Sequence, residues 1–372
     1  TPIRDVRDVR DVAEMEEESR RVVEAPRIVA DALVGLALGT VGDERKAKRA
    51  WEDLSMEVGP FLSGDDEAGR RIAHLTRKAL DADLPPGKPR RRPFHWPLKF
   101  PEVFQRENGG FDAIVGNPPF MGGQRIRGAL GKAYREYLVR WVAEGKKGSA
   151  DLVAYFYLRA FDLLRQGGDF GLLAVNTIAE GDTRQVGLER LVGEKGAVIY
   201  AAYPNEPWPG KAAVVTSRVH VRKGEWENAA ILSGQSVPFV SAFLSDQEEW
   251  TPKRLKANEG QSFQGSIVLG MGFVLSEEEA LAMIERDPKN RDVLFPYLNG
   301  KDLNSHPEQK PNRWVINFWD WPEEKAREYE APYRIVLDKV KPERQRRRPN
   351  GEYQLRKPLP QRWWQYGEKR PA

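Results

Sequence analysis

Apolar and polar positions follow three different spacing patterns along the chain, and the first pattern predicts helices. From residue 1 to about 82, apolar residues recur at helical spacing, and the charged repeat Arg4–Val12 brings opposite charges close enough to pair on a helix. A polar loop at Ser63–Asp66 precedes another helix, from Glu67 to about Leu80. Proline and arginine then dominate 85–93, which is typical of an exposed connector, although it also suits phosphate contact. Residues 1–93 are therefore predicted to be a helical segment and linker.

Over residues 94–225, the second pattern predicts strands that alternate with helices. Phe111–Val115 is a short apolar run with β-branched residues, which predicts a buried strand. Such alternation is typical of an α/β fold with a parallel-type sheet, and the last two strands, with no helix between them, predict a hairpin. The other predicted helices are Gly131–Glu144, Asp151–Gln166 (stopped by Gly167-Gly168) and Arg184–Val192, and the other strands are Phe170–Val175, Ala197–Tyr203 and Ala212–Val221.

The third pattern covers residues 226–372. This region has shorter predicted strands, longer polar loops and more tryptophans. The stretches Leu294–Leu303 and Trp314–Trp321 are its clearest signatures. Trp363 and Trp364 are interpreted as core residues. This change of character predicts a separate α+β domain.

The amino-acid composition excludes several classes of protein. The 372 residues include no cysteine, which excludes disulfides and thiolate metal sites, and the four histidines show no metal-binding spacing. No apolar run approaches the ~18 residues of a membrane span, and there is no secretory signal. We therefore expect a cytoplasmic protein without a membrane or metal partner. Because the chain starts at Thr1 and stops in a basic aromatic stretch, we also expect it to be a fragment.

Positive charge is concentrated near the end of the chain. Residues 339–370 hold 11 Lys/Arg against 3 Asp/Glu, about +8, whereas the whole chain carries +4 and the rest about −4. Localised positive charge is expected where a protein meets a polyanion. Arg346, Arg347 and Arg348 are the candidate phosphate contacts, and a solvated basic tail is the alternative.

The loop Asn117-Pro118-Pro119-Phe120 follows the first predicted strand, where open α/β sheets bind ligands. Two prolines stiffen it, and the residue before a proline is held out of helical geometry. The Asn117 side-chain oxygen and nearby carbonyls thus become fixed acceptors beside an aromatic ring, which suits a planar heterocycle with an exocyclic amino group. A simple strand-ending turn is the alternative from this tetrapeptide alone.

Longer stretches carry a resemblance to a family. In order they are FPEVF, GGFDAIVGNPPF, DLVAYFYLRAFDLLRQGG, GLLAVNTIAEGDTR, PWPGKAAVVTSRVHVRKG, and GMGF followed by FPYLNGKDLNSHP, with WWQYG. From about Phe94 onward, the chain resembles S-adenosylmethionine-dependent DNA adenine-N6 methyltransferases of restriction–modification and phage-defence systems, including the type IIG group. The resemblance implies a Rossmann-like methyltransferase sheet in 94–225 and a target recognition domain in 226–372. It also implies double-stranded DNA and further defence-complex subunits as partners.

The resemblance also implies roles for individual residues. Asn117 and the Pro118 carbonyl would accept the two amino protons of a flipped adenine, with Pro119 stiffening the loop and Phe120 stacking on the base. Phe156 would pack against the cofactor's adenine, although its helical spacing equally suits a core aromatic. His220 falls where relatives carry an aromatic on the other face of the base, so this residue departs from the family pattern.

One expected feature is missing before Phe111: the glycine-rich cofactor loop and its acidic ribose partner. The cofactor half of the sheet is therefore expected to be absent, although Gly270–Phe273 leaves a permuted arrangement open. A DNA-binding specificity module with an inactive methyltransferase core is the second hypothesis. Cytosine-N4, RNA and protein glutamine remain alternative acceptors because each presents an amino group. We find no nuclease motif.

Overall fold

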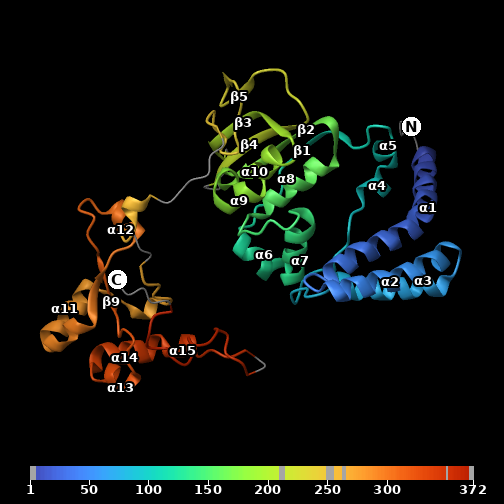
Figure 1. Ribbon diagram of the computed structural model, residues 1–372. Helices are drawn as coiled ribbons and strands as arrows, with labels where there is room; N and C mark the ends of the chain where they lie inside the picture. Colours follow the sequence, from blue (N-terminus) through green and yellow to red (C-terminus); the bar gives the residue numbers. More distant parts are fainter. Residues whose placement is uncertain (1–5, 209–213, 249–254, 262–264, 349–350, 368–372) are drawn as a thin grey trace. The chain divides into compact units, whose positions relative to one another are not determined.

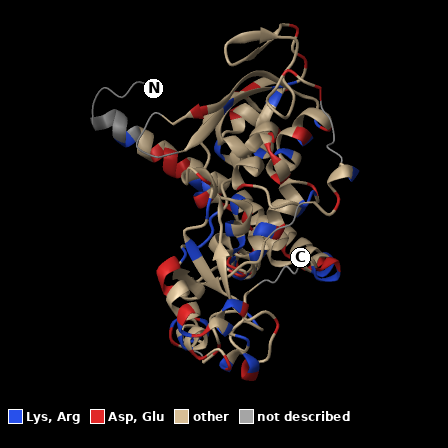
Figure 2. Cartoon of the chain, turned by 90° about the vertical axis from the view of Figure 1, so that its left-hand side faces the viewer, with Lys and Arg blue, Asp and Glu red and all other residues tan. Residues whose placement is uncertain are grey.

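The computed structural model describes residues 6–208, 214–248, 255–261, 265–348 and 351–367 (Figure 1). The chain divides into two compact units, residues 1–251 and 252–372. Acidic and basic residues are interspersed in both units (Figure 2). Within the described part of the chain, no helix has the length and apolarity needed to cross a membrane.

The first unit begins with three helices, which confirms the helical prediction and the loop at Ser63–Asp66, whereas the break between Gly39 and Glu44 was not predicted. They are α1 (Val6–Gly39), α2 (Glu44–Leu62) and α3 (Asp66–Leu80). Asp43 caps α2 and Asp65 caps α3, each by accepting backbone N–H groups in the first turn. The helices enclose a small core made by Ala32, Leu36, Leu54 and Ile72.

The basic linker fastens these helices to the rest of the unit. The Arg91 guanidinium donates to the carbonyls of Leu80 at 2.7 Å, Ala82 at 2.8 Å and Leu130 at 2.6 Å. Desolvation lowers the pKa of Arg91 from its usual value. Arg91 is thus used as an internal brace, and the exposed-connector interpretation is wrong for this residue.

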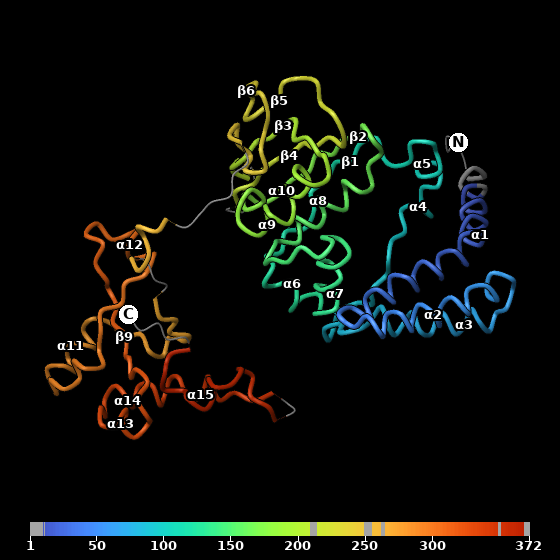
Figure 3. Tube along the Cα trace, viewed as in Figure 1, coloured from blue at the N-terminus to red at the C-terminus, as the bar shows by residue number. Residues whose placement is uncertain are grey.

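A six-stranded mixed sheet forms the centre of the unit, in the order β1-β2-β4-β3-β5-β6 (Figure 3). Strand β1 is parallel to β2, and β3 is parallel to β5, whereas β2–β4, β3–β4 and β5–β6 are antiparallel. The predicted hairpin is confirmed as β3–β4. The strands are β1 (Phe111–Gly116), β2 (Leu164–Val175), β3 (Ala197–Pro207), β4 (Val215–Lys223), β5 (Ala230–Leu232) and β6 (Gln235–Val237).

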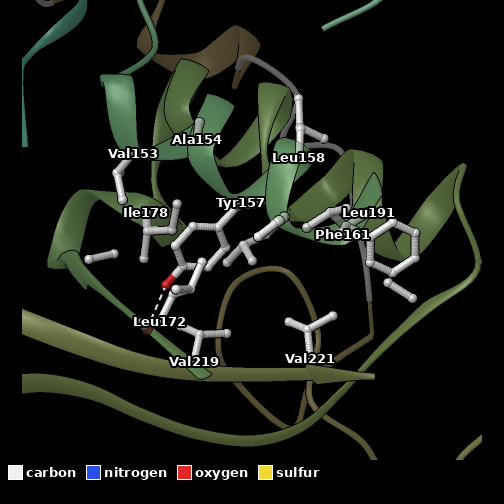
Figure 4. Close-up of a cluster of buried hydrophobic side chains, with 14 of the residues drawn as sticks. Val153, Ala154, Tyr157, Leu158, Phe161, Leu172, Ile178, Leu191, Val219 and Val221 are labelled. Atoms are coloured by element: carbon white, nitrogen blue, oxygen red, sulfur yellow. Dashed lines mark hydrogen bonds between the residues drawn. The ribbon is translucent and has the colours of Figure 1, made fainter. Parts of the chain in front are cut away.

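Helices pack on one face of this sheet and form the main core (Figure 4). In that core the Tyr157 hydroxyl donates to the Leu172 carbonyl at 2.9 Å. Complete burial raises the pKa of Tyr157, so its hydroxyl remains a donor. The helices of the region are α4 (Trp96–Lys99), α5 (Pro101–Phe104), α6 (Gly123–Leu130), α7 (Lys132–Tyr137), a π-helical turn (Leu138–Val142), α8 (Leu152–Leu163), α9 (Gly181–Val186) and α10 (Leu188–Gly193).

The strand β1 lies at the edge of the sheet, which corrects the prediction of a buried strand. Its neighbour on one side is β2, and Val115 is 88% exposed. Ile114 packs against the core, so Ala113 and Val115 face away from it. The strand β1 therefore has the apolar composition of a strand buried on both faces, although one of its faces is exposed.

The helix predicted for Asp151–Gln166 ends early, at Leu163. Gly167 and Gly168 lie inside β2 instead of stopping the helix. The pairing of β1 with β2 shifts register between Phe111 and Ala113, opposite this glycine pair. A Cβ on Gly168 would come within 2.8 Å of the Phe111 carbonyl, so close strand contact explains this glycine better than a helix end does.

The sheet continues beyond residue 225, the predicted boundary between the α/β region and the following domain. Ala201 and Ala202 of β3 pair with Ile231 and Leu232 of β5. Contacts divide the chain after Thr251, so residues 226–251 lie in the first unit.

The second unit has the predicted α+β character. Its sheet has the order β7-β9-β8, with both pairs antiparallel. Trp363 and Trp364 are 2% and 9% exposed, which confirms their prediction as core residues. The elements are β7 (Val274–Ser276), α11 (Glu277–Arg286), β8 (Leu294–Tyr297), α12 (Gly300–Ser305), β9 (Arg313–Ile316), α13 (Glu323–Arg327), α14 (Glu330–Lys339) and α15 (Lys341–Arg344).

A buried guanidinium joins the end of the second unit to its beginning. Arg344 is 2% exposed and donates to the carbonyls of Val268 at 3.0 Å, Leu269 at 2.9 Å and Trp363 at 3.2 Å, and also to that of Gln365. Desolvation lowers its pKa from the usual value. One side chain thus holds two backbone segments about 95 residues apart in the chain.

Candidate active site

The loop Asn117–Phe120 leaves the sheet directly after β1. Because β1, β2 and β3 run in the same direction, their carboxyl ends meet at one edge of the sheet. Ligands of open α/β sheets bind at this edge. The structure therefore confirms that a strand ends immediately before the loop.

The loop is held at both ends. Gly116 pairs with Leu172 in the sheet, and on the far side the Met121 N–H donates to Asp151 Oδ1 at 3.0 Å. The Met121 carbonyl accepts from the Leu152 N–H at 2.9 Å. Four residues, two of them proline, thus span two fixed points, which leaves the loop little freedom.

Burial differs from residue to residue in the loop. Pro118 is buried, whereas Asn117 and Pro119 are exposed. Phe120 is partly buried and packs against the main core. The Asn117 amide is therefore accessible to a ligand, while the proline that follows it anchors the backbone.

Phe156 is an exposed apolar residue on α8, whereas the other apolar residues of this helix are buried. Its side chain is 42% exposed, whereas Tyr155 and Tyr157 on either side are 3% and 0% exposed. The alternative of a core aromatic is wrong for Phe156. An exposed ring on a buried helix suits contact with a flat ligand, and its contact with a cofactor stays a prediction.

His220 lies in the middle of β4. Gly171 of β2 pairs with both Val115 and His220, so the histidine is two strands from β1 and level with a residue two positions before Asn117. Its ring lies 5.8 Å from that of Tyr200, and a Cβ on Gly171 would come within 2.9 Å of the imidazole. The structure does not bring His220 beside the loop, and its stacking on a base stays a prediction.

The protonation of His220 gives a test by pH. Burial, and secondarily the charge of Arg218, lowers its pKa below the usual value of about 6.5. The unfolded chain therefore binds the proton first, so this residue reduces stability as pH falls below about 6.5 and has no effect above it. We expect the stability advantage of the native chain over His220→Gln to shrink between pH 7 and pH 5, measured by urea unfolding. An unchanged difference would contradict the lowered pKa.

Trp208 is a residue at this edge to which the sequence analysis gave no role. It directly follows β3, is 37% exposed, and its N–H donates to the Val214 carbonyl at 3.0 Å. An exposed aromatic between two prolines at a strand end was the available signal.

The three candidate arginines of the second unit are exposed. Arg347 donates to the Gly351 carbonyl at 3.0 Å and to the Tyr353 hydroxyl at 3.2 Å, and stacks 4.6 Å from the Tyr353 ring. Arg346 and Arg348 share this accessible strand-like segment. Their contact with phosphate stays a prediction.

The glycine stretch Gly270–Phe273 has a structural use in the second unit. Gly270 has a φ of +126°, Met271–Phe273 form a 3₁₀ turn before β7, and a Cβ on Gly272 would come within 2.7 Å of Val340. The positive φ explains Gly270, and close packing explains Gly272. They follow no strand of the six-stranded sheet, which argues against the permuted cofactor loop. In the described part of the chain, no cluster of His, Cys, Asp or Glu is placed to hold a metal ion.

The fold and this site define a mixed α/β protein with a rigid, accessible loop at the carboxyl edge of its sheet. Residues 68–191, from α3 to α10, match the family described as Eco57I restriction-modification methylase. This matched region contains β1, the loop Asn117–Phe120 and α8.

A solved structure shares the fold. The chain is similar to the type IIL restriction-modification enzyme MmeI, whose structure was determined in complex with DNA, with a TM-score of 0.56 and 14% sequence identity. The similarity covers 82% of this chain and 42% of the MmeI chain, so the chain spans less than half of that enzyme. A comparison with curated proteins gives no match.

Proposed function

We propose that this chain carries the catalytic loop of a DNA methyltransferase of a restriction–modification or phage-defence system, which transfers a methyl group to the N6 amino group of a flipped adenine. The observation that carries the proposal is the loop Asn117–Phe120, rigid at both ends and open at Asn117. The methylase match over residues 68–191 supports it, as does the fold similarity to a DNA-bound restriction–modification enzyme.

The proposed chemistry needs orientation more than a strong base. The Asn117 side-chain oxygen and the Pro118 carbonyl accept the two amino protons, which directs the nitrogen lone pair outward. S-adenosylmethionine, when bound, supplies a methyl group on a cationic sulfur. Transfer would form an N–C bond at the amino nitrogen held by Asn117 and Pro118 as the donor's S–C bond breaks; the donor would leave as a neutral thioether, and the extra amino proton would pass to solvent. Phe120 stacks on the base.

The residues fit this cofactor in part. The exposed ring of Phe156 suits an adenine face, whereas the sequence before β1 offers no glycine-rich loop. No described strand pairs with β1 on the side opposite β2, and a strand bearing such a loop would pair at this edge. We therefore expect weak cofactor binding by the chain alone.

The test is transfer of a tritiated methyl group from S-adenosylmethionine to mixed duplex DNA by the native protein. Digestion to nucleosides then assigns the label, and label on N6-methyladenosine supports the proposal. Label on N4-methylcytidine would replace adenine by cytosine. RNA and protein substrates, assayed in parallel, test the other amino acceptors.

A DNA-binding module with an inactive core is the second candidate, favoured by the missing glycine-rich loop. It predicts salt-sensitive DNA binding and no transfer by the native protein.

The exposed arginines give a quantitative prediction. Replacing Arg346 and Arg348 with glutamine removes two candidate phosphate contacts, so the slope of log K against log salt should become shallower by about 1 per arginine. Fluorescence anisotropy with labelled duplex DNA at several salt concentrations measures it. Lys289→Gln, which removes an exposed cation paired with Glu328, is the control and should leave the slope unchanged. An unaltered slope in the arginine variants would identify a solvated basic segment.

A further inference from the structure

Asp151 connects two parts of the first unit that the proposed chemistry needs in a fixed relation. It is 8% exposed and comes directly before α8. Its Oδ1 accepts the Val153 N–H at 3.0 Å, which caps the helix, and also the Met121 N–H at 3.0 Å. One carboxylate oxygen therefore serves a helix end and the residue next to Phe120.

The surroundings hold Asp151 itself in place. Its own N–H donates to Thr183 Oγ1 at 3.1 Å, and the Leu152 N–H donates to the Met121 carbonyl. A Cβ on Gly123 would come within 2.4 Å of the Ser149 carbonyl, so the backbones after the loop and before α8 are in direct contact. The carboxylate thus closes a short backbone clamp between residues 121–123 and 149–152.

A helix cap alone needs only the Val153 bond. The second bond reaches 30 residues back along the chain and fixes the end of the loop opposite to β1. Since a misplacement of about 1 Å can reduce a reaction rate about 100-fold, the position of this end matters for the alignment of Asn117.

We propose that Asp151 is a positioning residue for the loop Asn117–Phe120, acting through the Met121 N–H. The inference rests on the proposed function for its catalytic consequence, whereas its structural part stands independently. Asp151 touches neither DNA nor cofactor in this role. It determines where the Asn117 oxygen and the Pro118 carbonyl point.

Hydrogen–deuterium exchange in the 372-residue chain tests the structural part. Asp151→Ala should raise the exchange rate of the Met121 amide at least about tenfold, whereas Asp151→Asn, which retains an acceptor oxygen, should largely preserve protection. Asp65→Ala is the matched control, because Asp65 caps α3 through Glu67 and Ala68 and does not contact the loop. Unchanged protection at Met121 in Asp151→Ala would overturn the proposal.

Methyl transfer by the native protein tests the catalytic part. We expect kcat to fall about 10- to 100-fold in Asp151→Ala, with KM for DNA nearly constant and substantial rescue in Asp151→Asn. Faster exchange at Met121 without a fall in kcat would overturn the positioning role while leaving the proposed function intact. Absence of transfer in the native protein would remove the proposed function, and the exchange result would still decide whether Asp151 fixes the loop.

Discussion

Replacing Asn117 with alanine is expected to reduce methyl transfer by at least about 100-fold while DNA affinity and stability stay close to those of the native protein. The variant loses one of two acceptors that orient the reactive nitrogen, and the loss of a single preorganised polar group typically costs 10²–10³ in kcat. Asn117 is exposed, so its truncation should change the free energy of unfolding by less than about 0.5 kcal/mol. Single-turnover transfer of a tritiated methyl group measures the effect.

Two variants make this result specific. Asn117→Asp keeps acceptor oxygens at the same position and should lose less activity than Asn117→Ala. Asn108→Ala applies the same truncation at the other end of β1, where Asn108 bonds the Gln166 backbone at 3.0 and 3.1 Å, and should leave kcat within about twofold. Equal transfer by Asn117→Ala and the native protein would exclude the loop as the catalytic element.

Replacing Arg344 with methionine is expected to destabilise the second unit by about 2–4 kcal/mol. The change leaves four carbonyls without their donor, and each unsatisfied buried polar group costs about 1–3 kcal/mol. Relief of the buried positive charge offsets part of this loss, as its lowered pKa indicates. Methionine preserves much of the apolar volume, so the experiment reports on the hydrogen bonds.

Native-state hydrogen exchange of the peptide 363–367 measures this effect within the second unit. Arg346→Met is the matched control, since that arginine is exposed two residues further along and should change stability by less than about 0.5 kcal/mol. Arg344→Lys should recover little, because one ammonium cannot reach carbonyls on both segments. A loss below about 1 kcal/mol in Arg344→Met would show that packing, and not the guanidinium, joins the segments.

Local sequence patterns predicted the helices and strands more accurately than they predicted which residues pack around them. The helical character of the N-terminal segment, the strand before the loop and the β3–β4 hairpin follow from periodicity and turn residues. The burial of β1 was mispredicted because apolar composition shows which surroundings a strand suits. It does not show that another segment of the same sequence provides them. The end of α8 was mispredicted because glycines that permit close strand pairing resemble glycines that stop a helix.

The site was predictable where one short segment contains it. The loop position follows from a strand followed by Asn-Pro-Pro, whereas the support from Asp151 and the exposed Trp208 depends on segments 30 and 91 residues away from Met121 and Asn117. The exposure of Phe156 was also beyond sequence reasoning, since its helical spacing fits core and surface equally. Contacts of this kind arise from tertiary packing, which periodicity does not describe.

The edge position of β1 has a practical consequence for anyone who purifies this chain. Among the described residues, no strand pairs with the outer edge of β1, and an edge strand with unpaired backbone groups, without lysine or proline to block it, is a template for adding strands from other molecules. Association of separately produced copies through this edge would grow with protein concentration and would be limited by a charge placed at Val115. The same edge that suits an added strand is therefore the place where we expect copies of the chain to associate.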